Sequence, residues 1–143
     1  MTYLLDVNIL IALAWPNHEH HAVATRWFAE VHEAGWATTP MTESSFVRIS
    51  SNARVFPEGV SPGQAAEVLR RYCGLPGHQF WADTTRLSER RASIADHVHG
   101  SGLVTDAHLA LVAAEHGGSL ATFDSRAAVL AQELGAQAVL LEA

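Results

Sequence analysis

The chain has 143 residues, of which 48% are hydrophobic and 17% charged, and its net charge at pH 7 is −6. These values suit one globular domain. No apolar run approaches the roughly 20 residues that cross a membrane, and the first residues do not resemble a signal peptide. Cys73 is the single cysteine, which excludes an intrachain disulfide. We therefore expect a cytoplasmic protein with no membrane partner.

The charges are distributed unevenly along the chain. All nine basic residues are arginines, and seven of them lie between residues 48 and 91 together with only four acids. The rest of the chain has two arginines and eleven acids. This distribution is compatible with an acidic pocket beside a phosphate-binding surface, and equally with solvated helix faces on which arginine replaces lysine.

The first half of the chain alternates short apolar runs with segments of helical periodicity. We predict strands over residues 2–6 and 36–38. We predict helices over residues 8–15, from Asn17 or His18 to Gly35, and over residues 40–50. Proline explains two boundaries, because Pro16 cannot continue the first helix and Pro40 suits a first helical turn.

The second half continues the alternation after a loop over residues 51–59. Ser61, Pro62 and Gln64 form the pattern of a capping box, so a helix is predicted from Pro62 to about Tyr72. A turn at Pro76 and Gly77 precedes further predicted elements, namely strands over 78–81, 120–123 and 138–141 and helices over 88–94, 106–116 and 126–134. Strands that alternate with helices predict an α/β fold with a mainly parallel sheet.

Four acidic residues follow or end apolar segments, and they are the main functional signal. Asp6 and Asp124 each close a predicted strand, Glu43 lies in a predicted first helical turn, and Asp106 opens a helix after residues 103–105. Ligands of open α/β sheets bind at the carboxyl ends of the strands. Carboxylates gathered there repel one another unless a cation is bound, and oxygen ligands suit Mg²⁺ or Mn²⁺. The pattern predicts metal-dependent phosphoryl-transfer chemistry.

Each acid taken alone has a second interpretation. Asp6 and Asp124 could cap the helices that follow them, while Glu43 and Asp106 could stabilise a first helical turn through the helix dipole. It would be a coincidence for all four acids to serve only as caps in four strand-to-helix positions, so we favour the metal-site interpretation. Cys73 has no evident base nearby in the sequence, so we expect an inert thiol.

Four motifs in this order resemble the PIN-domain ribonucleases, and among them the VapC toxins of bacterial toxin–antitoxin pairs. The motifs are Leu4-Leu5-Asp6-Val7-Asn8, Thr42-Glu43, Val104-Thr105-Asp106-Ala107-His108 and Ala121-Thr122-Phe123-Asp124. The resemblance implies a single PIN domain over residues 1–143 with a three-layer α/β/α fold and a mainly parallel central sheet.

The same resemblance implies a site and partners. Asp6, Glu43, Asp106 and Asp124 would be the catalytic and metal-binding carboxylates, supported by Asn8 and Thr105. Mg²⁺ would be the cofactor, with Mn²⁺ as a substitute. The substrate would be RNA, transfer RNA before ribosomal or messenger RNA, and the toxin would form homodimers and be neutralised by a VapB-type antitoxin. Arg126 stands where some relatives have a further acid or asparagine, so the resemblance does not decide whether the site holds one metal ion or two.

Two other classes of function remain as alternatives. A phosphatase of the aspartyl-phosphate type would use Asp6 as its nucleophile. Such enzymes usually have a second acid two residues later, where this chain has Asn8, and the chain has no lysine to neutralise phosphate. A binding module without turnover is the other alternative, and the complete set of four acids argues against it.

Overall fold

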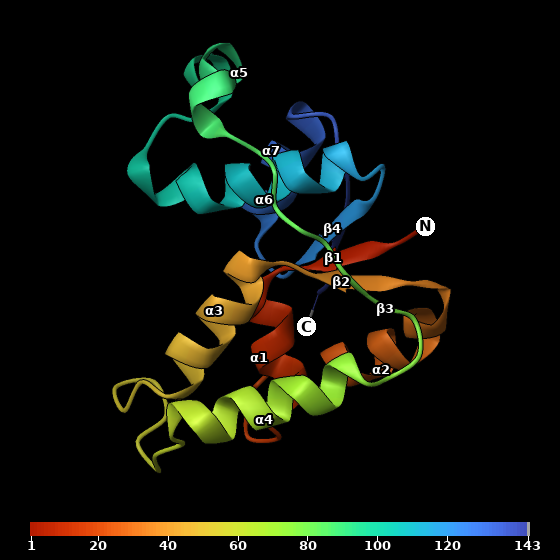
Figure 1. Cartoon of the computed structure of the whole chain (residues 1–143), viewed down its shortest axis with the longest axis vertical. Helices are drawn as coiled ribbons and strands as arrows, with labels where there is room; N and C mark the ends of the chain where they lie inside the picture. Colours follow the sequence, from red (N-terminus) through yellow and green to blue (C-terminus); the bar gives the residue numbers. More distant parts are fainter. Residues whose placement is uncertain (143) are drawn as a thin grey trace.

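A computed structural model describes residues 1–142 and places one parallel sheet between two layers of helices (Figure 1). The sheet contains β1 (Tyr3–Leu5), β2 (Trp36–Thr38), β3 (His78–Phe80), β4 (Ser119–Thr122) and β5 (Gln137–Leu140). Its strand order is β3-β2-β1-β4-β5, and all four neighbouring pairs are parallel. The predicted α/β class, three-layer arrangement and parallel sheet are therefore confirmed.

Helices cover both faces of the sheet. The helices are α1 (Val7–Ala14), α2 (His21–Val31), α3 (Pro40–Ser50), α4 (Pro62–Cys73), α5 (Arg91–His97), α6 (Val104–Glu115) and α7 (Ser125–Glu133), with short 3-10 turns η1 (His32–Ala34), η2 (Leu87–Glu89) and η3 (Ser101–Leu103). Figure 1 shows α1 to α4 on one side of the strands and α5 to α7 on the other. Among residues 1–142, no helix has the length and apolarity needed to cross a membrane.

The alternation of side chains along β1 explains the two layers. Leu5 is fully buried against α1 to α4, in a cluster that includes Trp36 and Phe46. Its neighbour Leu4 is fully buried in the opposite cluster with Leu109 of α6. Successive residues of a strand face opposite sides of the sheet, so a central strand with helices on both faces is apolar throughout.

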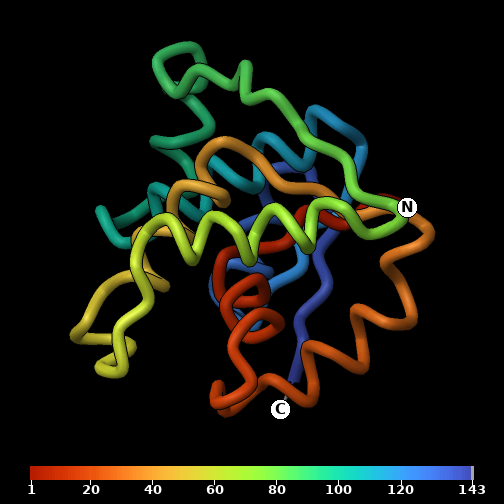
Figure 2. The backbone as a smooth tube through the Cα atoms, turned by 60° about the horizontal axis from the view of Figure 1, so that its bottom comes forward, coloured from red at the N-terminus to blue at the C-terminus, as the bar shows by residue number. Residues whose placement is uncertain are grey.

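The chain crosses from one helical layer to the other after β3 (Figures 1 and 2). The predicted turn at Gly77 precedes this strand, with φ of 85°. A Cβ atom at Gly77 would overlap the carbonyl oxygen of His32, so only glycine fits there. Beyond β3, Trp81 is buried beneath the second layer and its ring stacks on His116 at 4.2 Å between centroids.

Three predicted elements differ from the structure by more than one residue at an end. α2 begins at His21 rather than at Asn17 or His18, because His18 Nδ1 accepts a hydrogen bond from the His20 amide and stabilises a turn there. The short apolar segment before Asp106 is helical, since α6 begins at Val104. The helix predicted over 88–94 is divided into η2 and α5.

The predicted start of α4 is confirmed and provides a test of local stability. Ser61 Oγ accepts from the Gln64 amide at 3.1 Å, and Gln64 Oε1 accepts from the Ser61 amide at 2.9 Å. Ser61→Ala removes the first of these bonds, so we expect the free energy of unfolding in urea to fall by about 1 kcal/mol. Ser88→Ala, at an exposed serine of η2, is the control. Equal midpoints for both variants would contradict the capping assignment.

Candidate active site

Asp6 and Asp124 follow two adjacent strands at their carboxyl ends. Leu5 of β1 pairs with Ala121 of β4, and the Asp6 amide donates to the Ala121 carbonyl at 2.9 Å. Asp6 is only 5% exposed, whereas Asp124 is half-buried. The parallel pairing of β1 and β4 thus brings together two carboxylates that are far apart in the sequence.

A buried threonine hydroxyl connects these residues. Thr122 Oγ1 donates to Asp6 Oδ2 at 2.7 Å and accepts from Asn8 Nδ2 at 3.1 Å and from the Asp124 amide at 3.0 Å. Asn8 Oδ1 also accepts from the Phe123 amide at 3.3 Å. Asn8 therefore joins the loops that follow β1 and β4.

Asp106 lies in the first turn of α6, and its carboxylate interacts with both other aspartates. Burial, followed by the charges of Asp6 and Asp124, raises the pKa of Asp106 to about 6, and Arg126 opposes the shift. The pKa of Asp6 is also raised, chiefly by burial, while the Thr122 hydrogen bond acts in the opposite direction. The structure thus brings three of the four predicted acids into one electrostatic cluster, Asp6, Asp106 and Asp124.

Glu43 is directed elsewhere. Its Oε2 accepts from Thr38 Oγ1 at 2.7 Å, and the same hydroxyl lies 2.8 Å from His78 Nε2. Glu43, Cys73 and His78 each place one potential ligand atom within 4.8 Å of the other two, and no other group of three does so among residues 1–142. The predicted set of four acids is therefore divided into three aspartates and one separate glutamate.

The surroundings of Glu43 perturb two neighbouring groups. Burial raises the pKa of the Cys73 thiol, and the charge of Glu43 raises it further. Burial lowers the pKa of His78, and Glu43 opposes that shift. The sequence offered no signal for this grouping, because Cys73 and His78 lie 30 or more residues beyond Glu43.

The capping interpretation applies to one of the strand-end aspartates. Asp124 Oδ1 accepts from the amides of Arg126 at 2.8 Å and Ala127 at 3.4 Å, so it caps α7. Both bonds use Oδ1, which leaves Oδ2 free of that role. Asp6 occupies the corresponding position before α1 without a side-chain capping bond. The burial of Asp6 therefore has no explanation in helix capping.

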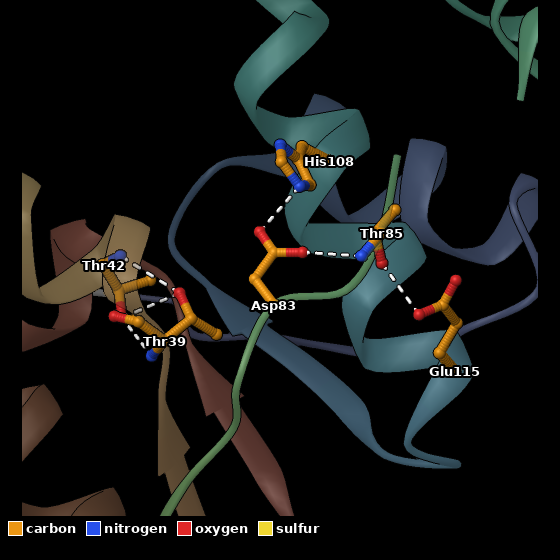
Figure 3. A network of polar contacts seen from close by, with 6 residues as sticks. All are labelled: Thr39, Thr42, Asp83, Thr85, His108 and Glu115. Atoms are coloured by element: carbon orange, nitrogen blue, oxygen red, sulfur yellow. Dashed lines mark hydrogen bonds and ion pairs between the residues drawn. The ribbon is translucent and has the colours of Figure 1, made fainter. Parts of the chain in front are cut away.

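Polar contacts fix the helices that carry Glu43 and Asp106 (Figure 3). On α6, His108 Nε2 lies 2.7 Å from Asp83 Oδ2, in the segment that crosses over after β3. Thr85 of the same segment donates to Glu115 at the end of α6, at 2.8 Å. On α3, Thr39 and Thr42 form a reciprocal capping box. These contacts hold both helix starts at the carboxyl edge of the sheet.

Two threonines lie near the predicted acids in different surroundings. Thr105, which the resemblance implies as a supporting residue, is the second residue of α6 and is exposed. Thr122, which was not predicted, is fully buried and contacts Asp6, Asn8 and Asp124. The available signal was a polar residue at the end of an otherwise apolar strand, two positions before an acid.

Thr122→Val tests the importance of the central hydroxyl. Valine has nearly the same shape but leaves the Asn8 amide and the Asp124 amide without their acceptor. We expect the free energy of unfolding to fall by about 1–2 kcal/mol. Urea unfolding of this variant and of Thr84→Val, at an exposed threonine, checks the effect. A loss no larger than that of the control would show that the hydroxyl does not hold the loops together.

Several arginines of the basic central region are engaged in surface ion pairs. Arg70 and Arg71 pair with Glu67, Arg86 pairs with Glu89, and Arg90 pairs with Glu115. Surface ion pairs therefore engage four of the seven arginines between residues 48 and 91. Arg126, which follows Asp124, is the arginine that acts on the aspartate cluster.

Comparisons with known proteins agree with this geometry. Residues 3–133 match the family model described as PIN domain. The chain is 50% identical over 125 residues to Ribonuclease VapC39 of Mycobacterium tuberculosis, covering 87% of this chain and 90% of that protein. The chain belongs to the PIN-domain family, among the VapC ribonucleases. Ribonuclease VapC38 of the same organism is 42% identical over 130 residues, covering 91% of this chain and 90% of that one.

A solved structure shares the overall fold of this chain. It is a domain of a functionally unknown protein from Methanocaldococcus jannaschii, with a TM-score of 0.56 and 19% sequence identity. The match covers 99% of this chain and 91% of that one. At this identity the likeness concerns the fold alone. The predicted membership of the PIN-domain VapC ribonucleases is confirmed by the family model and the sequence relatives together.

Proposed function

We propose that this VapC-type protein is a Mg²⁺-dependent endoribonuclease toxin in which Asp6, Asp106 and Asp124 bind the metal. The observation that carries the proposal is the meeting of these three carboxylates at the carboxyl edge of a parallel sheet, where burial first and neighbouring negative charge second raise the pKa of Asp6 and of Asp106. Carboxyl groups with pKa values raised in this way are characteristic of sites that bind a cation or perform acid–base chemistry.

The donor chemistry fits a hard divalent cation. The aspartate cluster offers carboxylate oxygens and no nitrogen or sulfur ligand, which suits Mg²⁺ and allows Mn²⁺ to replace it. When bound, such an ion supplies positive charge to the scissile phosphate and lowers the pKa of a coordinated water. The number of ions stays undefined in this proposal.

The protein side chains have separate tasks. Asp6, buried and held by Thr122, provides the most rigid carboxylate. Asp124 uses Oδ1 to cap α7 and keeps Oδ2 for the site. Asp106 enters from α6, on the side of the sheet opposite to α1. Glu43 completes the site when its side chain rotates away from Thr38, and in that position it orients water for attack on the phosphate.

The proposed partners follow from the family. Names such as Ribonuclease VapC39 describe relatives that cleave RNA. For this chain we propose RNA as the substrate, with a single-stranded loop of transfer RNA preferred over ribosomal or messenger RNA. A VapB-type antitoxin would neutralise the toxin in the cytoplasm, and the toxin would form homodimers.

The phosphatase alternative finds no support in the site. It requires an acid near Asp6 to protonate a leaving group, and the residue in that place is Asn8. Both ends of the Asn8 amide are engaged, since Nδ2 donates to Thr122 and Oδ1 accepts from Phe123. Asn8 therefore acts as a structural link, which favours hydrolysis at a metal site over an aspartyl-phosphate intermediate.

Cleavage of total bacterial RNA tests the proposal. The wild type and Asp106→Asn are each incubated with Mg²⁺, with Mn²⁺ and with a chelator. We expect discrete products from the wild type alone, with either metal and not with the chelator. Sequencing the product ends then identifies the target. Products that persist with the chelator, or equal products from both proteins, would contradict the proposed metal-dependent site.

A further inference from the structure

A second group of potential metal ligands lies outside the aspartate cluster. Glu43, Cys73 and His78 come from the start of α3, the end of α4 and the start of β3, and their ligand atoms lie within 4.8 Å of one another. All three side chains are half-buried. A carboxylate, a thiol and an imidazole from three separate elements meet at one point, and the proposed cleavage uses Glu43 only after it has rotated away from this group.

The chemistry of these ligands differs from that of the aspartate cluster. Sulfur and imidazole nitrogen favour zinc-like transition metals, whereas Mg²⁺ favours oxygen. Zinc binds four ligands tetrahedrally, with metal–ligand distances of about 2.0–2.3 Å, which puts the ligand atoms roughly 3.5 Å apart. The ligand atoms of Glu43, Cys73 and His78 lie within 4.8 Å of one another, so side-chain rotations are sufficient to close the site around an ion.

Buried polar support and open space are both present. Thr38 is fully buried, and its hydroxyl contacts both Glu43 Oε2 and His78 Nε2, so one residue fixes two of the three ligand side chains. Such outer contacts orient metal ligands. A groove of about 420 Å³ opens onto the same three residues and is lined also by Ser44, Leu69 and Arg70. The groove leaves a fourth coordination position for water.

We propose that Glu43, Cys73 and His78 form a Zn²⁺-binding site that is separate from the aspartate cluster. Zinc at this site holds the Glu43 carboxylate away from Asp6, Asp106 and Asp124. Zinc binding therefore inhibits RNA cleavage, a consequence that rests on the proposed function. Binding itself does not depend on the nuclease activity and is measured separately.

Cobalt(II) titration of the reduced full-length protein tests the binding. Cys73 is the single cysteine, so a thiolate-to-cobalt charge-transfer band in the ultraviolet reports on this site and not on the other eight histidines. We expect the wild type to show this band at one cobalt ion per chain and to lose it when zinc is added. Cys73→Ser should abolish the band, while His78→Ala and Glu43→Gln should weaken cobalt binding at least ~10-fold.

The matched control is His99→Ala, at an exposed histidine, which should bind cobalt like the wild type. Circular dichroism confirms that each variant is folded, and the conservative Cys73→Ser and Glu43→Gln keep the test valid if His78→Ala unfolds. Absence of the band in the wild type would overturn the proposal. An equal band in the wild type, His78→Ala and Glu43→Gln would also overturn it, because the thiolate would then bind cobalt without these partners.

A cleavage assay tests whether zinc binding at Glu43, Cys73 and His78 inhibits RNA cleavage. We expect micromolar zinc to inhibit Mg²⁺-dependent cleavage by the wild type and to inhibit Cys73→Ser at least ~10-fold less. Equal inhibition of both proteins would overturn the inhibitory consequence and indicate displacement of Mg²⁺ from the aspartates. If the wild type cleaves no RNA at all, the proposed function fails, while the cobalt band still decides the zinc site.

Discussion

Asp6→Asn should reduce Mg²⁺-dependent RNA cleavage by on the order of 10³-fold, equivalent to about 4 kcal/mol of transition-state stabilisation. Asp6 is the most buried of the three clustered carboxylates, and Thr122 holds its Oδ2 at 2.7 Å. Asparagine keeps an oxygen that accepts the same hydrogen bond, so the fold remains and only the negative charge is lost. Single-turnover cleavage across a range of Mg²⁺ concentrations measures the loss.

A control and a binding measurement separate charge from structure. Asp96→Asn changes an exposed aspartate of α5 and should cleave like the wild type. Calorimetry with Mn²⁺ should show weaker binding for Asp6→Asn than for this control. If Asp6→Asn is folded and cleaves RNA at the rate of the wild type, Asp6 is not a metal ligand and the site must be rebuilt around other residues.

Asp106→Asn should reduce RNA cleavage about as much as Asp6→Asn does. The same substitution should stabilise the metal-free protein. Burial and the charges of Asp6 and Asp124 raise the pKa of Asp106 to about 6. When a carboxyl group with such a raised pKa ionises, the folded protein becomes less stable. Because Asp106 is only half-buried and screened by water, we expect a gain of about 1–2 kcal/mol at pH 7.5, less than the full shift would give.

The direction of the pH dependence follows from proton linkage. The folded state holds the Asp106 proton more tightly than the unfolded state, whose pKa is near 3.8. The resulting stability is fully present below that value and is lost as the pH rises through about 6. The gain from Asp106→Asn should therefore be large at pH 7.5 and small at pH 4.

Thermal unfolding with and without Mg²⁺ measures both effects. We expect the Tm of metal-free Asp106→Asn to exceed that of the wild type by roughly 3–6 °C at pH 7.5. Mg²⁺ should raise the Tm of the wild type more than that of the variant, because the ion relieves repulsion that the variant lacks. An equal or lower Tm for the metal-free variant at pH 7.5 would contradict the inferred destabilisation by ionised Asp106.

Local sequence signals predicted much of the fold. The capping box at Ser61 and Gln64 is present in the structure, and β2 spans the predicted residues 36–38. Asp6 and Asp124 were predicted beside each other because carboxyl ends of parallel strands share one edge, and the β1–β4 pairing places them there. The first two features depend on residues within one turn or one strand, and the third follows from the general rule for parallel strands.

The remaining features depend on distant residues. Glu43 accepts a hydrogen bond from Thr38 and lies beside Cys73 and His78, and a long flexible side chain has no preference that a sequence reveals. Thr122 gains its role only when β4 pairs with β1, so its hydroxyl gave no local sign of contact with Asp6. α6 begins at Val104, within a short apolar run. Periodicity alone cannot decide whether so short a run is a strand or part of a helix.

The pairing of β1 with β4 has a consequence for synthesis on the ribosome. Asp6 is made long before Asp124, and β4 must insert beside β1 before their carboxylates meet. Until β4 has left the ribosome, the growing polypeptide carries isolated acids, and the proposed metal site is not assembled. The proposed nuclease therefore gains its activity only after β4 has been synthesised and has paired with β1.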